Sequence, residues 1–432
     1  MKHSKISDFC YFAFKAYIRY VHEMIFVRHR YIVGQENLPT KDDRYFIVSN
    51  HQNTANDPLN ILFSLPFNVR MNAMARANAF EVNPKISAFL LWMGVLPAFR
   101  LGWEGEGTVE QNFQSFDKVA ECVNSHFPVV IFPEAGHTQG HYLMRFTTGT
   151  VRMAFHAAKA NGWQHDVKIL PVAHHYADYF GLRSDFMLTM CKPISLQPYY
   201  ERFQTHPNSV MRELTREIRS AVHSVMLDEG EMDYAEVDFL RCSSMNPQHQ
   251  TAQTLPERCK SDQQFVDRLR ANSQYADIVS QARVLRQKEE SLGIDEQTVS
   301  AKPSWMATIA RLLLLIPLLP VWVFSLWPNG LCYWLPTLLL KSDRMFTNSF
   351  RFVLTVVVLY PLFALLTLLT MGVAWGYWWQ ALVWILLWTP MARFGWWYYQ
   401  FARRQIRGIR CLSHSETLRE IESLREEIIK ML

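Results

Sequence analysis

The chain has 432 residues, of which 49% are hydrophobic and 19% charged, and its mean hydropathy is close to neutral, which fits neither a fully soluble nor a fully embedded protein. Its seven cysteines form no C-x-x-C pair and no His/Cys cluster at metal-ligand spacing, so we expect neither a metal nor a disulfide framework. The net charge of +5 suits anionic membranes or substrates, whereas the basic residues are not interleaved with aromatic ones as in nucleic-acid grooves.

The first 31 residues are predicted to form an amphipathic helix at a membrane interface. On helical spacing, one side carries Cys10, Phe14, Tyr17, Val21, Met24 and Ile25, and the other carries Lys15, Arg19, His22 and Glu23. An ordinary helix packed on the neighbouring domain has the same periodicity, so both interpretations stay open. No small-residue cleavage site follows, which disfavours a secretory signal peptide.

Between residues 45 and 192, short apolar runs alternate with helical patterns, which predicts an α/β fold. The expected strands are residues 45–48, 69–75, 94–99, 129–132, 169–173 and 186–190, and the expected helices are residues 85–93, 108–125 and 149–160. Catalytic residues in such folds lie where strands end. Polar residues that follow these runs are therefore candidates for a site.

One such candidate is His51, within Ser49-Asn50-His51-Gln52-Asn53-Thr54-Ala55-Asn56-Asp57. An imidazole can take a proton near neutral pH, and a carboxylate can orient it and stabilise the imidazolium. His51 with Asp57 therefore suggests a base that activates a hydroxyl. One histidine with a nearby aspartate also occurs by chance in many proteins, so the pair needs further support.

Three later runs also end in residues that carry chemistry. Arg100, at the end of residues 94–100, could bind a phosphate, although a surface salt bridge is the simpler interpretation of an arginine alone. Phe132-Pro133-Glu134-Ala135-Gly136 places a carboxylate in a turn where Glu134 could accept a hydrogen bond from a substrate hydroxyl. Leu170-Pro171-Val172 breaks a strand with a proline, which by itself indicates an edge strand or a bulge.

The rest of the chain is expected to divide into three parts. Residues 201–303 form a charged helical extension, either a lid or a solvated spacer, with helical patterns at 209–228 and 261–288. Residues 304–399 form a transmembrane region, because residues 309–326, 352–371 and 376–391 are each about long enough to cross a bilayer core of roughly 30 Å. Residues 400–432 form a basic and helical cytoplasmic tail.

Lysines and arginines after residues 340 and 391 place both of these loops on the cytoplasmic side by the positive-inside rule. Residues 309–340 would then be a hairpin or re-entrant loop, with a short stretch broken by Pro336. In the tail, Ser413 to Glu416 is a possible capping box, and Leu418, Ile421, Leu424, Ile428 and Met431 share one side.

Taken in this order, the four runs resemble the phospholipid/glycerol acyltransferase family, typified by lysophosphatidate acyltransferase. The matching residues are Asn50, His51 and Asp57 in the first block, residues 94–100 in the second, Phe132-Pro133-Glu134 in the third and Leu170-Pro171-Val172 in the fourth, with Phe146-Thr147-Thr148-Gly149 and Arg152 before the fourth. The resemblance covers roughly residues 32–193. It implies an acyltransferase domain at residues 32–200, with a mixed sheet flanked by helices.

Two features depart from the family pattern. Five residues instead of four separate His51 from Asp57, and on a regular helix one extra residue turns a side chain by ~100°. The pairing then needs a turn that absorbs the insertion. We assign the orienting role to Asp57 because the neutral Asn56 would stabilise an imidazolium poorly. Ala135 replaces the usual glycine and no basic residue follows shortly after it, which leaves Arg100, Arg145 or Arg152 to bind an acceptor phosphate.

The resemblance implies transfer of a fatty acyl group from acyl-CoA or acyl-ACP to a glycerol-phosphate hydroxyl in phospholipid biosynthesis, with no bound cofactor. His51 and Asp57 would be catalytic, and backbone N–H groups would stabilise the oxyanion. The substrate-binding residues would be Asn50, Arg100, Phe132, Pro133, Glu134, Gly136 and Arg152. The catalytic domain is expected on the cytoplasmic face of the inner (cell) membrane, in contact with its lipids.

The default acceptor is 1-acyl-glycerol 3-phosphate, a lysophospholipid. The long helical insert and membrane tail look more like the larger glycerol-3-phosphate/dihydroxyacetone-phosphate acyltransferases, which makes those acceptors the alternative. From a different class, a non-catalytic lipid-binding membrane protein with this fold is favoured only by the shifted Asp57 and the altered third block.

Overall fold

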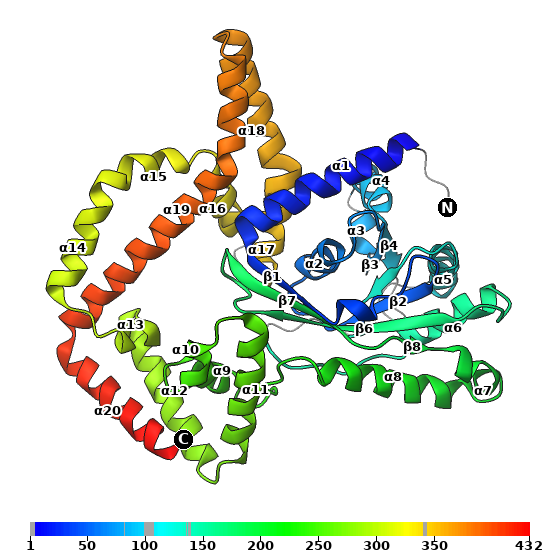
Figure 1. Cartoon of the computed structure of the whole chain (residues 1–432), viewed down its shortest axis with the longest axis horizontal. Coiled ribbons are helices and arrows are strands. Elements are labelled where there is room, and N and C mark those ends of the chain that lie inside the picture. Colours follow the sequence, from blue (N-terminus) through cyan, green and yellow to red (C-terminus); the bar gives the residue numbers. More distant parts are fainter. Residues whose placement is uncertain (1–4, 82, 99–107, 135, 137–139, 340–343) are drawn as a thin grey trace. The chain divides into compact units, whose positions relative to one another are not determined.

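The computed structural model describes residues 5–81, 83–98, 108–134, 136, 140–339 and 344–432. Two compact units make up the chain (Figure 1). Unit one comprises Met1–Tyr20, Arg30–Tyr179 and Phe186–Met226, and unit two comprises Val21–His29, Phe180–Asp185 and Leu227–Leu432. Each unit has a hydrophobic core of its own.

Unit one is organised around a mixed sheet. Its strands are β1 (Val27–Val33), β2 (Arg44–Ser49), β3 (Asn72–Arg76), β4 (Val95–Ala98), β5 (Val129–Ile131), β6 (Val167–Tyr176), β7 (Ser184–Met190) and β8 (Ile194–Ser195). They lie in the order β1-β7-β6-β2-β5-β3-β4, with β8 on β6. β2 is parallel to β5 and β6, whereas β7 and β8 are antiparallel to β6. The carboxyl ends of β2, β5 and β6 therefore meet at one edge of the sheet.

Helices cover this sheet. They are α1 (Lys5–Val21), α2 (Asn56–Ser64), α3 (Asn78–Glu81), α4 (Pro84–Trp92), α5 (Thr108–Asn124), α6 (Gly149–Ala160), α7 (Tyr200–Thr205) and α8 (Pro207–His223), with short turns η2 (Gln35–Asn37) and η3 (Gln197–Tyr199). Buried side chains of α5, α6 and α8 share one core with β2, β5 and β6. α8 thus belongs to unit one, although the sequence analysis places it in the extension.

The predicted α/β fold is confirmed, and all six predicted strands and three predicted helices are present with small shifts at their ends. β1 and β8 were not predicted. In β1, the three consecutive basic residues Arg28, His29 and Arg30 interrupt the alternation of apolar and polar residues that would predict a strand. The Arg30 guanidinium packs over the rings of Phe63 and Phe186, at 5.8 and 5.3 Å from their centroids, and donates to Asn60.

The prediction that Pro171 lies in an edge strand is wrong, because its strand, β6, lies between β2 and β7. Its register with β2 is continuous from Arg44↔Val167 to Ser49↔Val172, so there is no bulge on that side. On the other side, β8 pairs with β6 up to Ile169, and β7 pairs with it from Val172. Pro171 lies at this change of partner, where the missing N–H leaves no ladder bond unmade.

The buried face of α1 also differs from the prediction. Tyr11, Lys15 and Ile18 are buried, while Ile6 and Phe9 are 77% and 75% exposed. Lys15 was assigned to the polar side, but its Nζ donates to the carbonyls of Phe67 and Val69 at 3.0 and 2.9 Å. Burial, with a smaller effect of the Arg19 charge, lowers the pKa of Lys15 to about 8. The hydrogen bonds to these carbonyls offset the free-energy cost of burying the amine.

Unit two is helical apart from its share of β1 and β7. Its elements are η1 (His22–Phe26), α9 (Tyr234–Cys242), α10 (Pro247–Thr251), α11 (Leu255–Ala271), α12 (Tyr275–Leu292), α13 (Glu296–Ser300), α14 (Trp305–Leu315), η4 (Ile316–Leu318), α15 (Leu319–Ser325), α16 (Asn329–Leu339), α17 (Arg344–Val353), η5 (Leu354–Leu359), α18 (Tyr360–Thr367), η6 (Leu368–Ala374), α19 (Trp378–Ser413) and α20 (Ser415–Met431). Buried residues of α9, α11, α12 and α20 form its core.

The predicted tail helix is α20, and its predicted apolar side packs into this core. The predicted capping box is wrong. Ser413 ends α19, and the residue before α20 is His414, whose side chain makes no cap hydrogen bond. A capping box instead opens α11, where Thr254 and Glu257 each bond the other's backbone N–H.

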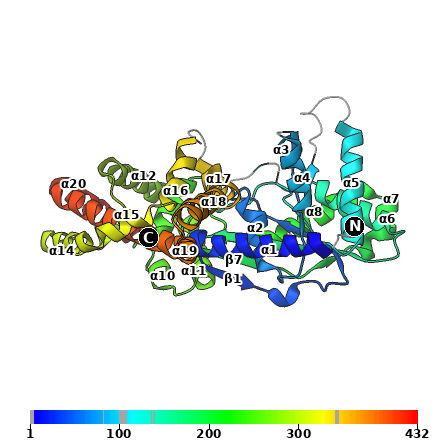
Figure 2. The same cartoon turned by 90° about the horizontal axis from the view of Figure 1, so that it is seen from above.

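Within the described part of the chain, two helical segments are long and apolar enough to cross a bilayer, Trp305–Ser325 and Phe346–Ala374. They match the first two predicted spans. The third, residues 376–391, is the first part of α19, where tryptophans and Gln380 lower the hydropathy. α14 and α15 each contact α19, and Figure 1 and Figure 2 show the three helices as neighbours within unit two.

Glu289 in α12 predicts how stability depends on pH. Burial and the charge of Glu296, opposed by Arg425, raise its pKa from 4.5 to about 8. The folded state therefore holds an extra proton between these values, and stability falls as the pH rises from about 4.5 to about 8. We expect Glu289→Gln to raise the Tm relative to wild type, with a larger gain at about pH 8 than at about pH 5.

The measurement is thermal unfolding of the purified full chain at both pH values. Glu427→Gln, on the exposed side of α20, is the matched control and should leave the Tm difference near zero. An equal gain for Glu289→Gln at both pH values would contradict the assignment.

Candidate active site

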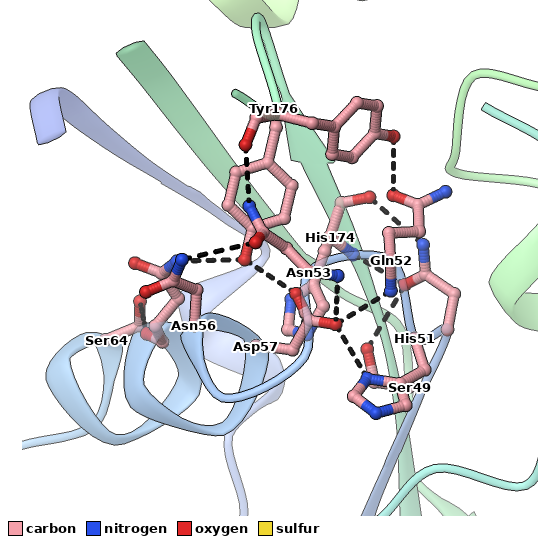
Figure 3. A network of polar contacts seen from close by, with 12 residues as sticks. Ser49, His51, Gln52, Asn53, Asn56, Asp57, Ser64, His174 and Tyr176 are labelled. Carbon is pink, nitrogen blue, oxygen red and sulfur yellow. Dashed lines mark hydrogen bonds and ion pairs between the residues drawn. The ribbon is translucent and has the colours of Figure 1, made fainter. Parts of the chain in front are cut away.

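The candidate site lies where β2, β5 and β6 end. His51 follows β2, and β6 ends with His174 and Tyr176 (Figure 3). Phe132 to Glu134 follow β5. The three strands are neighbours and parallel, so residues far apart in the sequence converge at this edge.

His51 and Asp57 form a direct pair. The distance from His51 Nδ1 to Asp57 Oδ2 is 2.8 Å; the Asp57 side chain is completely buried and that of His51 is 20% exposed. An ionised carboxylate only accepts, so Nδ1 carries the hydrogen. In the neutral ring the lone pair that can take a proton is then on Nε2.

Three further donors hold the Asp57 carboxylate. The backbone N–H groups of Gln52 and Asn53 donate to Oδ2 at 2.7 and 2.8 Å, and the Tyr176 hydroxyl donates to Oδ1 at 2.6 Å (Figure 3). Burial alone would raise the pKa of Asp57, but His174, His51 and the Asn53 amide lower it to about 2. The carboxylate is therefore ionised at neutral pH and fixed in orientation.

A tight turn accommodates the extra residue between His51 and Asp57. Thr54 adopts a left-handed conformation with φ 43°, and the N–H of Asn56 donates to the Asn53 carbonyl at 2.9 Å. α2 then begins at Asn56, so Asp57 lies in its first turn. The Asn56 side chain points to Asn53 Oδ1, at 3.2 Å, whereas Asp57 reaches the imidazole (Figure 3).

His174 lies on the other side of Asp57. Its Nε2 is 4.0 Å from Asp57 Oδ1, and neither ring nitrogen has a hydrogen-bond partner among the described residues. Burial lowers the pKa of His174 to about 4 against the attraction of Asp57, with His51 adding to the decrease. His174 is therefore uncharged at neutral pH and fills the space behind the carboxylate.

The residues after β5 shape the other wall of the site. The Phe132 ring stacks on the His51 imidazole, with centroids 4.2 Å apart and planes at 19°. Pro133 is buried, and its carbonyl accepts from the Thr147 N–H and hydroxyl at 2.9 and 3.1 Å. Stacking and the Asp57 bond together fix the plane of the imidazole.

Glu134 is buried beside this pair. Neither carboxyl oxygen has a partner of hydrogen-bond geometry within the described ranges, although the N–H groups of His51 and Met144 lie near it. Burial raises the pKa of Glu134 to about 8; the Asp57 charge adds to this, and the two N–H groups and Arg219 oppose it. At neutral pH the carboxyl is thus protonated and can donate a hydrogen bond as well as accept one.

The structure also describes four other residues that the sequence predicted for the site: Asn50, Gly136, Arg145 and Arg152. Asn50 is fully buried and binds the His174 backbone, donating to its carbonyl at 3.2 Å and accepting from its N–H at 2.8 Å, so it positions the turn. Gly136 is partly buried near the Met144 side chain. Arg152 on α6 is exposed, and so is Arg145. Arg100 and Ala135 lie outside the described residues.

Sequence reasoning missed His174, Tyr176 and Arg219. The first two alternate at the end of β6, so they share a face of a buried strand, and this spacing of polar rings was a usable indication. Arg219 lies on α8, more than 80 residues after Glu134 in the sequence, and donates to the carbonyls of Leu143 and Met144. No local pattern links it to the site.

Residues 29–175 match the model of a protein family described as Acyltransferase. These residues form an acyltransferase domain. The predicted resemblance to acyltransferases, placed at roughly residues 32–193, is thereby confirmed. His51, Asp57, Phe132 and Glu134 all lie within this domain.

A solved structure of the 1-acyl-sn-glycerophosphate (LPA) acyltransferase PlsC from Thermotoga maritima matches with 15% identity and a TM-score of 0.33, over 50% of this chain and 82% of that chain. No curated protein matches the sequence.

The geometry predicts which residue of the acyltransferase domain orients His51. Asp57→Asn replaces an acceptor of four hydrogen bonds by an amide that stabilises an imidazolium poorly, so kcat should fall by about 100-fold or more. Asn56→Ala is the matched control, because among the described residues the Asn56 side chain bonds only Asn53, and kcat should change less than about threefold. Acyl-transfer rates at saturating substrate measure both. A large loss for Asn56→Ala with a silent Asp57→Asn would reverse the assignment.

Proposed function

We propose that the acyltransferase domain transfers a fatty acyl group from acyl-CoA or acyl-ACP to the hydroxyl of 1-acyl-glycerol 3-phosphate. The observation that carries this proposal is the buried Asp57 carboxylate bonded to His51 Nδ1 at 2.8 Å, in a domain that matches acyltransferases. The resemblance of the four sequence blocks to glycerolipid acyltransferases supplies the substrate class.

In the proposed reaction, His51 Nε2 removes the proton from the acceptor hydroxyl as its oxygen attacks the thioester carbonyl. Asp57 stabilises the imidazolium that forms. The tetrahedral intermediate then collapses: the C–S bond breaks, the new ester remains, and the thiolate takes the proton back from Nε2. Phe132 holds the ring plane throughout, which limits the reorientation needed between the two proton transfers.

We propose that Glu134 binds the acyl acceptor. Because its carboxyl is protonated at neutral pH, it can donate a hydrogen bond to an acceptor oxygen without adding negative charge beside Asp57. A phosphate-bearing acceptor would be repelled by a second carboxylate here. Arg100, at the end of the second block, remains our prediction for the phosphate partner.

We further propose that the protein is an integral membrane protein whose catalytic domain lies on the cytoplasmic face of the inner (cell) membrane. Exposed apolar side chains on the two long helices support this, including Leu314, which is 70% exposed. Ile6 and Phe9, which are exposed on α1, would enter the membrane interface. The arginines after residue 391 support the cytoplasmic orientation.

The test of this function is an acceptor panel with labelled acyl-CoA and acyl-ACP. It contains 1-acyl-glycerol 3-phosphate, glycerol 3-phosphate and dihydroxyacetone phosphate, the last two being the alternative acceptors. We expect transfer to the first, and a loss of about 10³-fold in kcat/KM for His51→Ala. The exposed His165→Ala serves as control and should match wild type. Absence of any His51-dependent product would support a non-catalytic lipid-binding protein instead.

Glu134 gives a separate prediction about pH. As the pH rises through about 8, Glu134 ionises and the wild-type rate should decrease. Glu134→Gln keeps a neutral donor and acceptor, so its rate near pH 7 should stay within about tenfold of wild type and lack this decrease. A pH–rate profile of both proteins, with Glu134→Ala as the variant that loses the group, measures it. An identical alkaline decrease in Glu134→Gln would show that another group titrates.

A further inference from the structure

Unit two contains a pocket of its own, separate from the residues of the acyltransferase site. η1 and the segment at Leu182 and Arg183 form part of its wall, and α15, α16, α17, η5 and α19 contribute the other elements. Its lining is mostly apolar and aromatic, with Phe26, Trp322, Leu326, Tyr333, Trp334 and Trp396. Such a surface fits a hydrocarbon chain better than a polar metabolite.

Three arginines also line this pocket: Arg183, Arg351 on α17 and Arg393 on α19. They come from three separate parts of the sequence. Within the described part of the chain, none of the three has a carboxylate within ion-pair distance. The nearby carboxylate, Asp185, already pairs with Arg28 and His29.

Arg351 is the most deeply placed of the three, at 7% exposure. Its guanidinium donates to the Tyr333 carbonyl at 3.1 Å, to Asn348 Oδ1 at 2.8 Å and to the Thr337 hydroxyl at 2.8 Å, and it lies 4.2 Å from the centroid of the Tyr333 ring. All of these partners are neutral. A buried cation that has hydrogen bonds but no counter-charge is stabilised by a nearby anion.

The other two arginines have N–H groups that can donate hydrogen bonds to a ligand in the pocket. Arg183 uses one nitrogen, Nη1, for the carbonyls of Glu23, Met24 and Val27, and its Nε and Nη2 form no hydrogen bond to a described residue. Arg393 is exposed, and its guanidinium lies 3.9 Å from Met24 Sδ. Burial and the Arg393 charge lower the pKa of Arg183, so the two cations repel each other. An anion between them would relieve this repulsion.

We propose that this pocket binds one anionic phospholipid, with its phosphate on Arg183, Arg351 and Arg393 and an acyl chain along the aromatic wall. Guanidinium groups match phosphate oxygens in fork geometry. Basic pockets between apolar helices are suited to lipid headgroups, and the two candidate spans contribute to these walls. The inference goes beyond the proposed function, since none of these residues belongs to the His51 site.

The test is native mass spectrometry of the full chain purified in detergent, with added phosphatidylglycerol. We expect one tightly retained lipid on wild type and about tenfold weaker retention on Arg393→Gln. Arg404→Gln is the matched control, because Arg404 is also exposed on α19 but does not line the pocket, and it should retain the lipid as wild type does. Arg183→Gln, a second variant, should also weaken retention.

Three further arms decide the ligand. Phosphatidylcholine, which is zwitterionic, should not displace phosphatidylglycerol, and inorganic phosphate should not compete with it. His51→Ala should retain the lipid fully, which separates this site from the acyltransferase reaction. Equal retention by Arg393→Gln and wild type, displacement by phosphatidylcholine or by inorganic phosphate, or loss of the lipid in His51→Ala would each overturn the proposal.

Discussion

The buried carboxylate of Asp57 is the group on which the candidate site depends. Four donors surround it: the imidazole of His51, the N–H groups of Gln52 and Asn53, and the Tyr176 hydroxyl. A charge taken out of water is tolerated only when its hydrogen bonds are made, and here they are. Three of these donors come from the turn after β2 and one from β6, so the orientation of the imidazole depends on the turn and on the pairing of these two strands.

The parallel arrangement of β2, β5 and β6 turns three separate stretches of sequence into one site. β2 supplies the imidazole, β5 supplies the stacking ring and the neutral acid Glu134, and β6 supplies Tyr176 and His174. The same burial has opposite results for its two acids. Asp57 stays ionised because donors surround it, whereas Glu134 stays protonated because burial outweighs the few donors that the described residues place near it. This separation gives one site both a charge-stabilising carboxylate and a hydrogen-bond-donating one.

The elements that depend on local sequence patterns were predicted correctly. Buried strands, the helices over them and the residues at strand ends were readable, because an apolar run followed by a polar turn has few other interpretations. Contacts between distant residues were not readable. Lys15 is buried because carbonyls of Phe67 and Val69 meet it, and Pro171 fits a central strand because β8 gives way to β7 beside it. Likewise, nothing near Glu134 in the sequence indicates that its carboxyl is buried with so few donors among the described residues.

The left-handed Thr54 has a consequence for how such domains are recognised. A β-branched residue in this region is strained, so the turn is held by the bonds around it and not by its own preference. This turn keeps the imidazole nitrogen within 2.8 Å of the carboxylate across five intervening residues, so the number of residues between the pair can differ wherever a turn takes up the difference. A search that fixes that number would pass over chains whose active-site chemistry is unchanged.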